Sequence, residues 1–178
     1  MADSSRSLQR AAPIALPVAA LVVLLDQLTK HWALNALDTG PKHVVWTLRF
    51  NLAFNSGMAF SRGRGLGPVI GALALVVVVV AVIGLARSRG LQRSWALPIG
   101  MIVGGAAGNL TDRLFRGEGW LRGSVVDFID LQWWPIFNVA DIGVTVGGAW
   151  LLLVTARATS EPTDPADPVA DQAAVDRG

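Results

Sequence analysis

Long apolar stretches separated by short polar segments dominate the pattern along the chain. Residues 66–86 carry no charge and include five consecutive valines, Val76 to Val80. Residues 95–111 form a second uncharged stretch, and the stretches 11–37 and 142–156 complete the pattern. About 20 apolar residues cross the hydrocarbon core of a bilayer as a helix. The pattern therefore predicts transmembrane helices over about residues 11–37, 66–86, 95–113 and 138–157.

The segment between the first two stretches has a different pattern. His43 to Phe54 is rich in β-branched and aromatic residues and partly alternates, and Asn55 to Gly57 follow as a turn. Such a pattern is typical of short strands. We expect one or two strands within residues 41–62, in a small sheet on the outer surface of the membrane. Four tryptophans fit an aromatic belt on that side: Trp46, Trp120, Trp133 and Trp134.

Composition supports a membrane protein, because 52% of the residues are hydrophobic and only 16% are charged. Asp26, Lys30 and Trp32 stand where a signal peptide would need small residues, so the first stretch is interpreted as a retained span. The net charge of +2 and the scattered basic residues argue against nucleic acid as a partner. The chain has no cysteine and two histidines, which leaves a zinc peptidase without its usual ligands. We therefore expect no metal and no cofactor.

Four spans place both termini on one side of the membrane. The short turn with Arg87, Arg89 and Arg93 has no acid, so the positive-inside rule makes it cytoplasmic, and Arg6 and Arg10 agree. Residues 158–178 are rich in Pro, Ala and Asp without periodicity and predict a disordered cytoplasmic tail. Residues 1–157 form the membrane domain.

With this orientation, the unusual polar residues gather at the outer face. The set is Asp26, Lys30, Asn51, Asn55, Asn109, Asp112, Arg113, Asp127, Asn138 and Asp141. Ionisable groups near a bilayer are costly and usually functional.

Asp127 and Asp141 are the strongest candidates for chemistry. Asp127 lies among Val125, Val126 and Phe128, in a strand-like or helical setting. Two acids that converge in a partly dry site differ in proton affinity, so one is ionised and the other protonated. The pair could activate water and protonate a leaving amine, which is the chemistry of an aspartic peptidase.

A serine mechanism is poorly supported. Ser56, Ser61 and Ser124 lie on the outer side, but neither His31 nor His43 has a motif that links it to them.

Other polar residues allow two interpretations each. Asn109, Asp112 and Arg113 share one helix face and could orient catalytic groups, or Asp112 and Arg113 could form a helix-end ion pair. Asp26 and Lys30 are spaced as a helical ion pair.

Asn138 could cap the last helix, with Asp141 in its first turn favoured by the helix dipole. That interpretation would explain Asp141 without chemistry.

Glycines spaced by four suggest where helices touch. Gly100, Gly104 and Gly108 repeat this spacing in the third stretch, and Gly143 and Gly147 repeat it in the fourth. Small residues let helices approach closely in lipid. We expect the third and fourth helices to pack together.

The chain resembles the bacterial lipoprotein signal peptidase (signal peptidase II) family through five blocks in order between residues 26 and 147. These blocks are Asp26-Gln27-Leu28-Thr29-Lys30, Asn55-Ser56-Gly57-Met58-Ala59-Phe60, Gly108-Asn109-Leu110-Thr111-Asp112-Arg113, Val125-Val126-Asp127-Phe128 and Phe137-Asn138-Val139-Ala140-Asp141.

The resemblance implies an all-α integral membrane protein with four transmembrane helices and a small extracytoplasmic antiparallel β-cradle. It implies catalytic roles for Asp127 and Asp141. Supporting roles are implied for Asp26, Lys30, Asn55, Gly108, Asn109, Asp112, Arg113 and Asn138.

The function implied is removal of the signal peptide from diacylglyceryl-modified prolipoproteins, with cleavage before the lipidated cysteine. Membrane lipids would be the other partners, and we expect a monomer in the bacterial cell membrane with its active site near the outer face. The link from Phe115 to Ser124 is longer than usual for the family, which puts the local loop in question.

There are two alternative functions. A proton-coupled transporter would need acids near the midplane and a polar path to the other face, whereas this polar set stays at one face. In a structural membrane subunit, the acids would only pair with Arg113 or Lys30, and the apolar setting of Asp127 argues against this.

Overall fold

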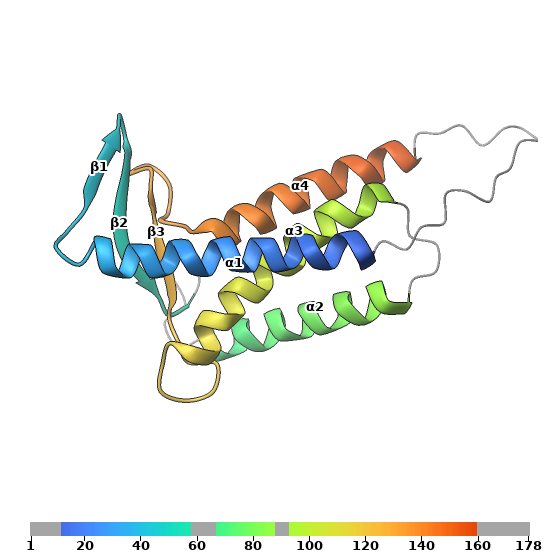
Figure 1. The fold of residues 1–178 in the computed structure, drawn as a ribbon, viewed down its shortest axis with the longest axis horizontal. Helices are drawn as coiled ribbons and strands as arrows, with labels where there is room; N and C mark the ends of the chain where they lie inside the picture. Colours follow the sequence, from blue (N-terminus) through green and yellow to red (C-terminus); the bar gives the residue numbers. More distant parts are fainter. Residues whose placement is uncertain (1–11, 58–66, 88–92, 160–178) are drawn as a thin grey trace, which may run out of the picture.

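The computed structural model describes residues 12–57, 67–87 and 93–159, and these form a helical bundle with a small sheet at one end (Figure 1). The elements in chain order are α1 (Ala12–Ala36), β1 (Lys42–Val45), β2 (Leu48–Asn55), α2 (Gly67–Arg87), α3 (Arg93–Phe115), β3 (Val125–Asp130) and α4 (Val139–Thr159). Each helix lies within about two residues of a predicted span. The tail expected from residue 158 falls outside the described residues beyond Thr159.

Among the described helices, three are long and apolar enough to cross a membrane. They are Pro13–Ala36 in α1, Gly67–Leu85 in α2 and Val139–Arg157 in α4. The predicted third span coincides with α3, which does not reach the same hydropathy. Its sequence is rich in glycine and alanine and ends in the charged pair Asp112 and Arg113.

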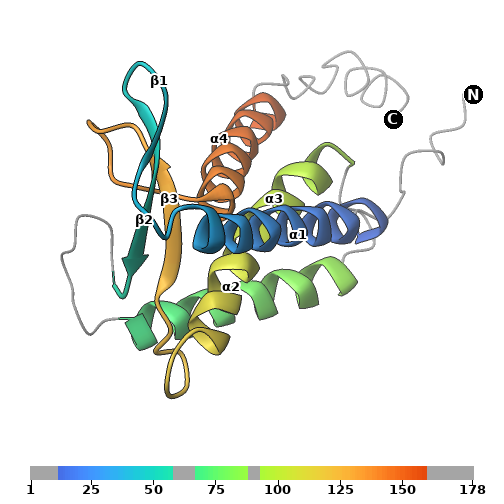
Figure 2. The same ribbon diagram turned by 60° about the vertical axis from the view of Figure 1, so that its left-hand side comes forward.

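Helix α3 packs against each of the other three helices, and α2 lies along it apart from α4 (Figure 2). Glycines allow these close approaches. A Cβ on Gly100 or Gly104 would come within 2.6 Å of a carbonyl oxygen of α1, and one on Gly105 would collide with the carbonyl oxygen of Ala140 in α4.

The predicted contact between the third and fourth helices is therefore present, but two of its predicted glycines lie elsewhere. Gly100 and Gly104 face α1, whereas Gly105 from α3 meets α4 together with Gly143 and Gly147. Spacing identifies small residues on a helix without saying which neighbour each one meets.

The sheet is antiparallel with strand order β1-β2-β3. From the sequence, the segment around Asp127 could be a strand or a helix. In the structure this segment is strand β3, and Asp127 lies opposite Ala53 of β2. Aromatic rings join the sheet to the end of α1, because Trp32 stands edge-on to Phe50 at 5.1 Å and to Phe128 at 6.0 Å. This contact fixes β3 beside the helix bundle.

Candidate active site

A cavity of about 870 Å³ lies between the sheet and the helix ends, and both Asp127 and Asp141 line it. Most of its other lining groups are apolar and come from α2, α3 and the segment before α4. A largely apolar cavity with a few convergent polar groups is the usual form of a ligand site. The polar side chains of the predicted site that reach it are Asn55, Asn109, Arg113, Asp127 and Asp141.

Strand geometry presents Asp127 to this cavity. Val125, Val126 and Phe128 are buried around it, and Asp127 itself is only 3% exposed. Its carboxylate accepts hydrogen bonds from Asn138 Nδ2 at 2.6 Å and from Asn55 Nδ2 at 3.3 Å.

A helix cap positions Asp141. The backbone N–H of Asp141 donates to Asn138 Oδ1 at 3.0 Å, and the N–H of Asn138 donates back to Asp141 Oδ2 at 3.2 Å. This reciprocal arrangement is a capping box in which Asp replaces the usual Glu or Gln. The predicted cap is confirmed, and Asp141 still lines the cavity.

Two amides join the carboxylates. Asn138 is fully buried, and its Nδ2 donates to Asp127 and, at 3.1 Å, to Asn109 Oδ1. Asn109 Nδ2 in turn donates to Asp141 Oδ1 at 2.8 Å. A continuous chain of hydrogen bonds therefore runs from Asp127 through both amides to Asp141.

Burial, and to a smaller extent the nearby charge of Asp141, raise the pKa of Asp127 to about 7. The hydrogen bonds from Asn138 and Asn55 act in the opposite direction, because they favour the charged form. Asp127 can therefore hold or release a proton near neutral pH, as an acid–base group in hydrolysis must.

Arg113 reaches the cavity from α3. Its Nη2 donates to the carbonyl oxygen of Gly57 at 3.1 Å, whereas Nη1 is buried and finds no hydrogen-bond partner among the described residues. The alternative in which Arg113 pairs with Asp112 is wrong, since Asp112 binds Lys30 at 2.8 Å and Arg116 at 2.6 Å. A buried donor left unpaired requires an explanation, and this one borders the cavity.

Asp26 and Lys30 lie behind the carboxylates rather than in the cavity. Their predicted ion pair is confirmed at 2.8 Å, and both side chains are fully buried. Gly108 is needed beside them, because a Cβ there would come within 2.7 Å of Asp26 Oδ2.

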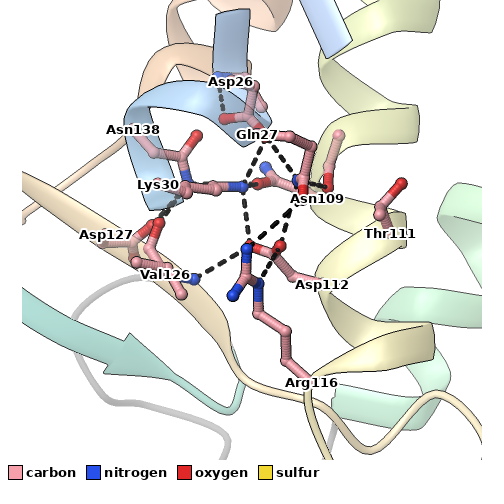
Figure 3. A network of polar contacts seen from close by, with 12 residues as sticks. Asp26, Gln27, Lys30, Asn109, Thr111, Asp112, Arg116, Val126, Asp127 and Asn138 are labelled. Carbon is pink, nitrogen blue, oxygen red and sulfur yellow. Dashed lines mark hydrogen bonds and ion pairs between the residues drawn. The ribbon is translucent and has the colours of Figure 1, made fainter. Parts of the chain in front are cut away.

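Two further residues, Gln27 and Arg116, belong to this network and were not among the predicted site residues. Gln27 Nε2 donates to Asp26 and to Asp112, and Arg116 pairs with Asp112 (Figure 3). The spacing of Asp112 and Arg116 by four residues on a helix was the available signal. Nothing local marked Gln27, whose partner Asp112 is 85 residues away.

Asn51, one of the polar residues predicted at the outer face, lies outside the cavity. Asn51 donates to Asp130 on the neighbouring strand, as does Arg49, so both stabilise the sheet. Ser56 borders the cavity, and Ser61 lies outside the described residues. In the link from Phe115 to Ser124, Leu121 is buried and would meet a Cβ on Gly71 at 3.0 Å, so this link packs on α2.

The sequence is similar to known proteins over most of its length. A family model described as signal peptidase (SPase) II matches residues 18–157. A protein of Mycobacterium avium named lipoprotein signal peptidase is 48% identical over 141 residues, which cover 78% of this chain and 76% of that protein. A protein of the same name from Mycolicibacterium smegmatis is 46% identical over 154 residues, 85% of this chain and 64% of its own length.

Solved structures show the same fold. A bacterial membrane enzyme structure superposes with a TM-score of 0.77 at 23% identity, over 90% of this chain and 98% of that chain. A second one has a TM-score of 0.66 at 24% identity, over 79% and 91% of the two chains.

Proposed function

The chain belongs to the signal peptidase II family, and from this membership we propose that it is an aspartic endopeptidase that processes lipoprotein precursors. It removes the signal peptide from diacylglyceryl-modified prolipoproteins by cutting on the N-terminal side of the lipidated cysteine. The observation that carries this proposal is the convergence of Asp127 and Asp141 on one largely apolar cavity.

The two carboxylates share the work of hydrolysis. One is ionised and removes a proton from water, whose oxygen bonds to the scissile carbonyl carbon. The other is protonated and gives its proton to the peptide nitrogen as the carbon–nitrogen bond breaks. Two coupled carboxylates titrate as a unit, so the acid role and the base role are assigned to the pair and not to one residue each.

Arg113 and Asn109 support this reaction. Nη1 of Arg113, which has no hydrogen-bond partner among the residues that the structure describes, is a donor for the scissile carbonyl oxygen, where negative charge develops. Asn109 holds Asp141 with its hydrogen bond of 2.8 Å. Asn55 and Asn138 hold Asp127.

The apolar lining suits a lipidated substrate. Ile70 and Ala74 of α2 and Ala106 and Leu110 of α3 border the cavity. The acyl chains of the substrate reach it laterally from the bilayer, and the enzyme works as a monomer.

We also propose that α3 crosses the membrane in addition to α1, α2 and α4, which gives four spans. Residues 1–157 then form one membrane domain, followed by a cytoplasmic tail. A helix surrounded by three others needs small residues for packing more than large apolar ones for lipid, which accounts for its modest hydropathy. The sheet and the cavity then face outward, and both termini are cytoplasmic.

Because the chain has no cysteine, single cysteines test this orientation. An impermeant maleimide added to intact cells is expected to label Lys42→Cys in β1, whereas Arg157→Cys in α4 becomes reactive only after lysis. The reverse pattern would overturn the orientation.

Cleavage of a purified precursor tests the activity. The protein in detergent is expected to cut a diacylglyceryl-modified prolipoprotein, and mass spectrometry should find the lipidated cysteine at the new N-terminus. The same precursor without its lipid is the control and should be cut far more slowly. Intact lipidated precursor after prolonged incubation would contradict the proposed activity.

A further inference from the structure

The backbone next to each candidate catalytic residue is held by a buried carboxylate. The N–H of Ala140, which precedes Asp141, donates to Asp26 Oδ1 at 2.9 Å. The N–H of Val126, which precedes Asp127, donates to Asp112 Oδ2 at 3.1 Å. The two halves of the pair are therefore anchored in the same way, one to α1 and the other to α3.

Lys30 joins these two anchors (Figure 3). Its Nζ lies 2.8 Å from Asp26 Oδ2, 2.8 Å from Asp112 Oδ2 and 3.0 Å from Asn109 Oδ1. An ammonium group has three N–H donors, so every donor of Lys30 has one acceptor. The side chain is fully buried.

The third contact also determines how Asn109 faces the cavity. Because Asn109 Oδ1 accepts from Lys30 and from Asn138, its Nδ2 is the group left to donate to Asp141. A reversed amide would point its NH₂ group at an ammonium ion. Lys30 thus acts on Asp141 by two routes, through the backbone of Ala140 and through the amide of Asn109.

We propose that Lys30 is a positioning residue that fixes the separation and orientation of Asp127 and Asp141, by bridging Asp26, Asp112 and Asn109. The inference rests on the proposed peptidase activity and adds a role to it. Lys30 borders neither the substrate nor the reacting atoms, since it does not line the cavity.

Stability alone is a weak reason for such a cluster. Buried ion pairs lose about as much in desolvation as they gain, and apolar replacements are often as stable. Asp112 also has a second cation in Arg116, which is 26% exposed. The feature specific to Lys30 is that it connects the anchors of both carboxylates.

The absence of cysteine permits a test that changes only the charge at this position. The variant Lys30→Cys is alkylated in SDS with 2-bromoethylamine, which rebuilds a lysine-like side chain, or with 2-bromoethanol, which ends in a neutral hydroxyl. Both proteins, and wild type treated in the same way, are then returned to mild detergent. The kinetic constants kcat and KM are then measured for cleavage of the lipidated precursor.

The aminoethyl protein is expected to approach the treated wild type, whereas the hydroxyethyl protein loses about 100-fold in kcat with little change in KM, the scale expected for a misplaced catalytic group. A purely structural role would lower the active fraction and the melting temperature together instead. Arg116→Met removes the other cation from Asp112 and is the matched control, with kcat expected near wild type.

Equal kcat for the aminoethyl and hydroxyethyl proteins would overturn the role of Lys30 while leaving the proposed function intact. If the treated and untreated wild-type proteins both fail to cut, the proposed function fails instead. If the neutral side chain prevents folding, Asp26→Asn/Lys30→Met carries the same test, because it leaves Asp112 paired with Arg116. A wild-type kcat in that double variant would also overturn the role.

Discussion

Asp127→Asn and Asp141→Asn are each expected to lower kcat on the lipidated precursor on the order of 10⁴-fold, the upper range for loss of acid–base catalysis. An amide has nearly the shape of a carboxyl group but can neither take a proton from water nor return one to the leaving nitrogen. Initial rates of cleavage, followed by gel shift or mass spectrometry in detergent, measure the loss.

The control for this prediction is Asp130→Asn on the same strand. Asp130 is buried like Asp127, but its carboxylate binds Arg49 at 2.7 Å and Asn51 at 3.0 Å in the sheet and does not line the cavity. It should retain most of the wild-type rate. Near wild-type cleavage by both Asp127→Asn and Asp141→Asn would mean that the pair is structural and the mechanism is wrong.

The pH dependence of kcat/KM is expected to have an alkaline limb near pH 7, set by the raised pKa of Asp127. The sign follows from the need for one proton on the pair. Above pH 7 Asp127 loses its proton, and no acid remains for the leaving amine. Activity should therefore fall about tenfold per pH unit on the alkaline side.

The variant Asn55→Ala tests whether Asp127 sets this alkaline limb. The hydrogen bond from Asn55 favours ionised Asp127 and lowers its pKa, so removing it should raise the pKa and move the alkaline limb to higher pH. Rates measured between about pH 5 and 9 resolve the limb. A profile that is flat through neutrality, or a limb that moves to lower pH in Asn55→Ala, would contradict the assignment to Asp127.

Helix positions were predictable because they depend on local composition. The bounds of α2, Gly67–Arg87, follow the uncharged stretch almost to the residue. The cap of α4 was equally local, since Asn138 and Asp141 are three residues apart and bind each other. The location of Asp127 on a strand could not be decided locally, because β3 is a strand only through its pairing with β2.

The partners of charged groups were less predictable for the same reason. Adjacent Asp112 and Arg113 looked like an ion pair, yet a lysine from α1 outcompetes Arg113 for that carboxylate. Likewise, glycine spacing marked α3 as a packing helix, but only the crossing of α1 over α3 decides that Gly100 and Gly104 face α1. Sequence identified most of the residues that matter, and tertiary contacts determined what each one touches.

The capping box at Asn138 and Asp141 also bears on how the enzyme is made. One half of the proposed catalytic pair belongs to β3 and the other to the first turn of α4, and they meet only when α4 has docked against α3. Before α4 is in place, Asp127 has no Asp141 beside it and the pair is incomplete. We therefore expect the newly made chain to be inactive until α4 has docked against α3.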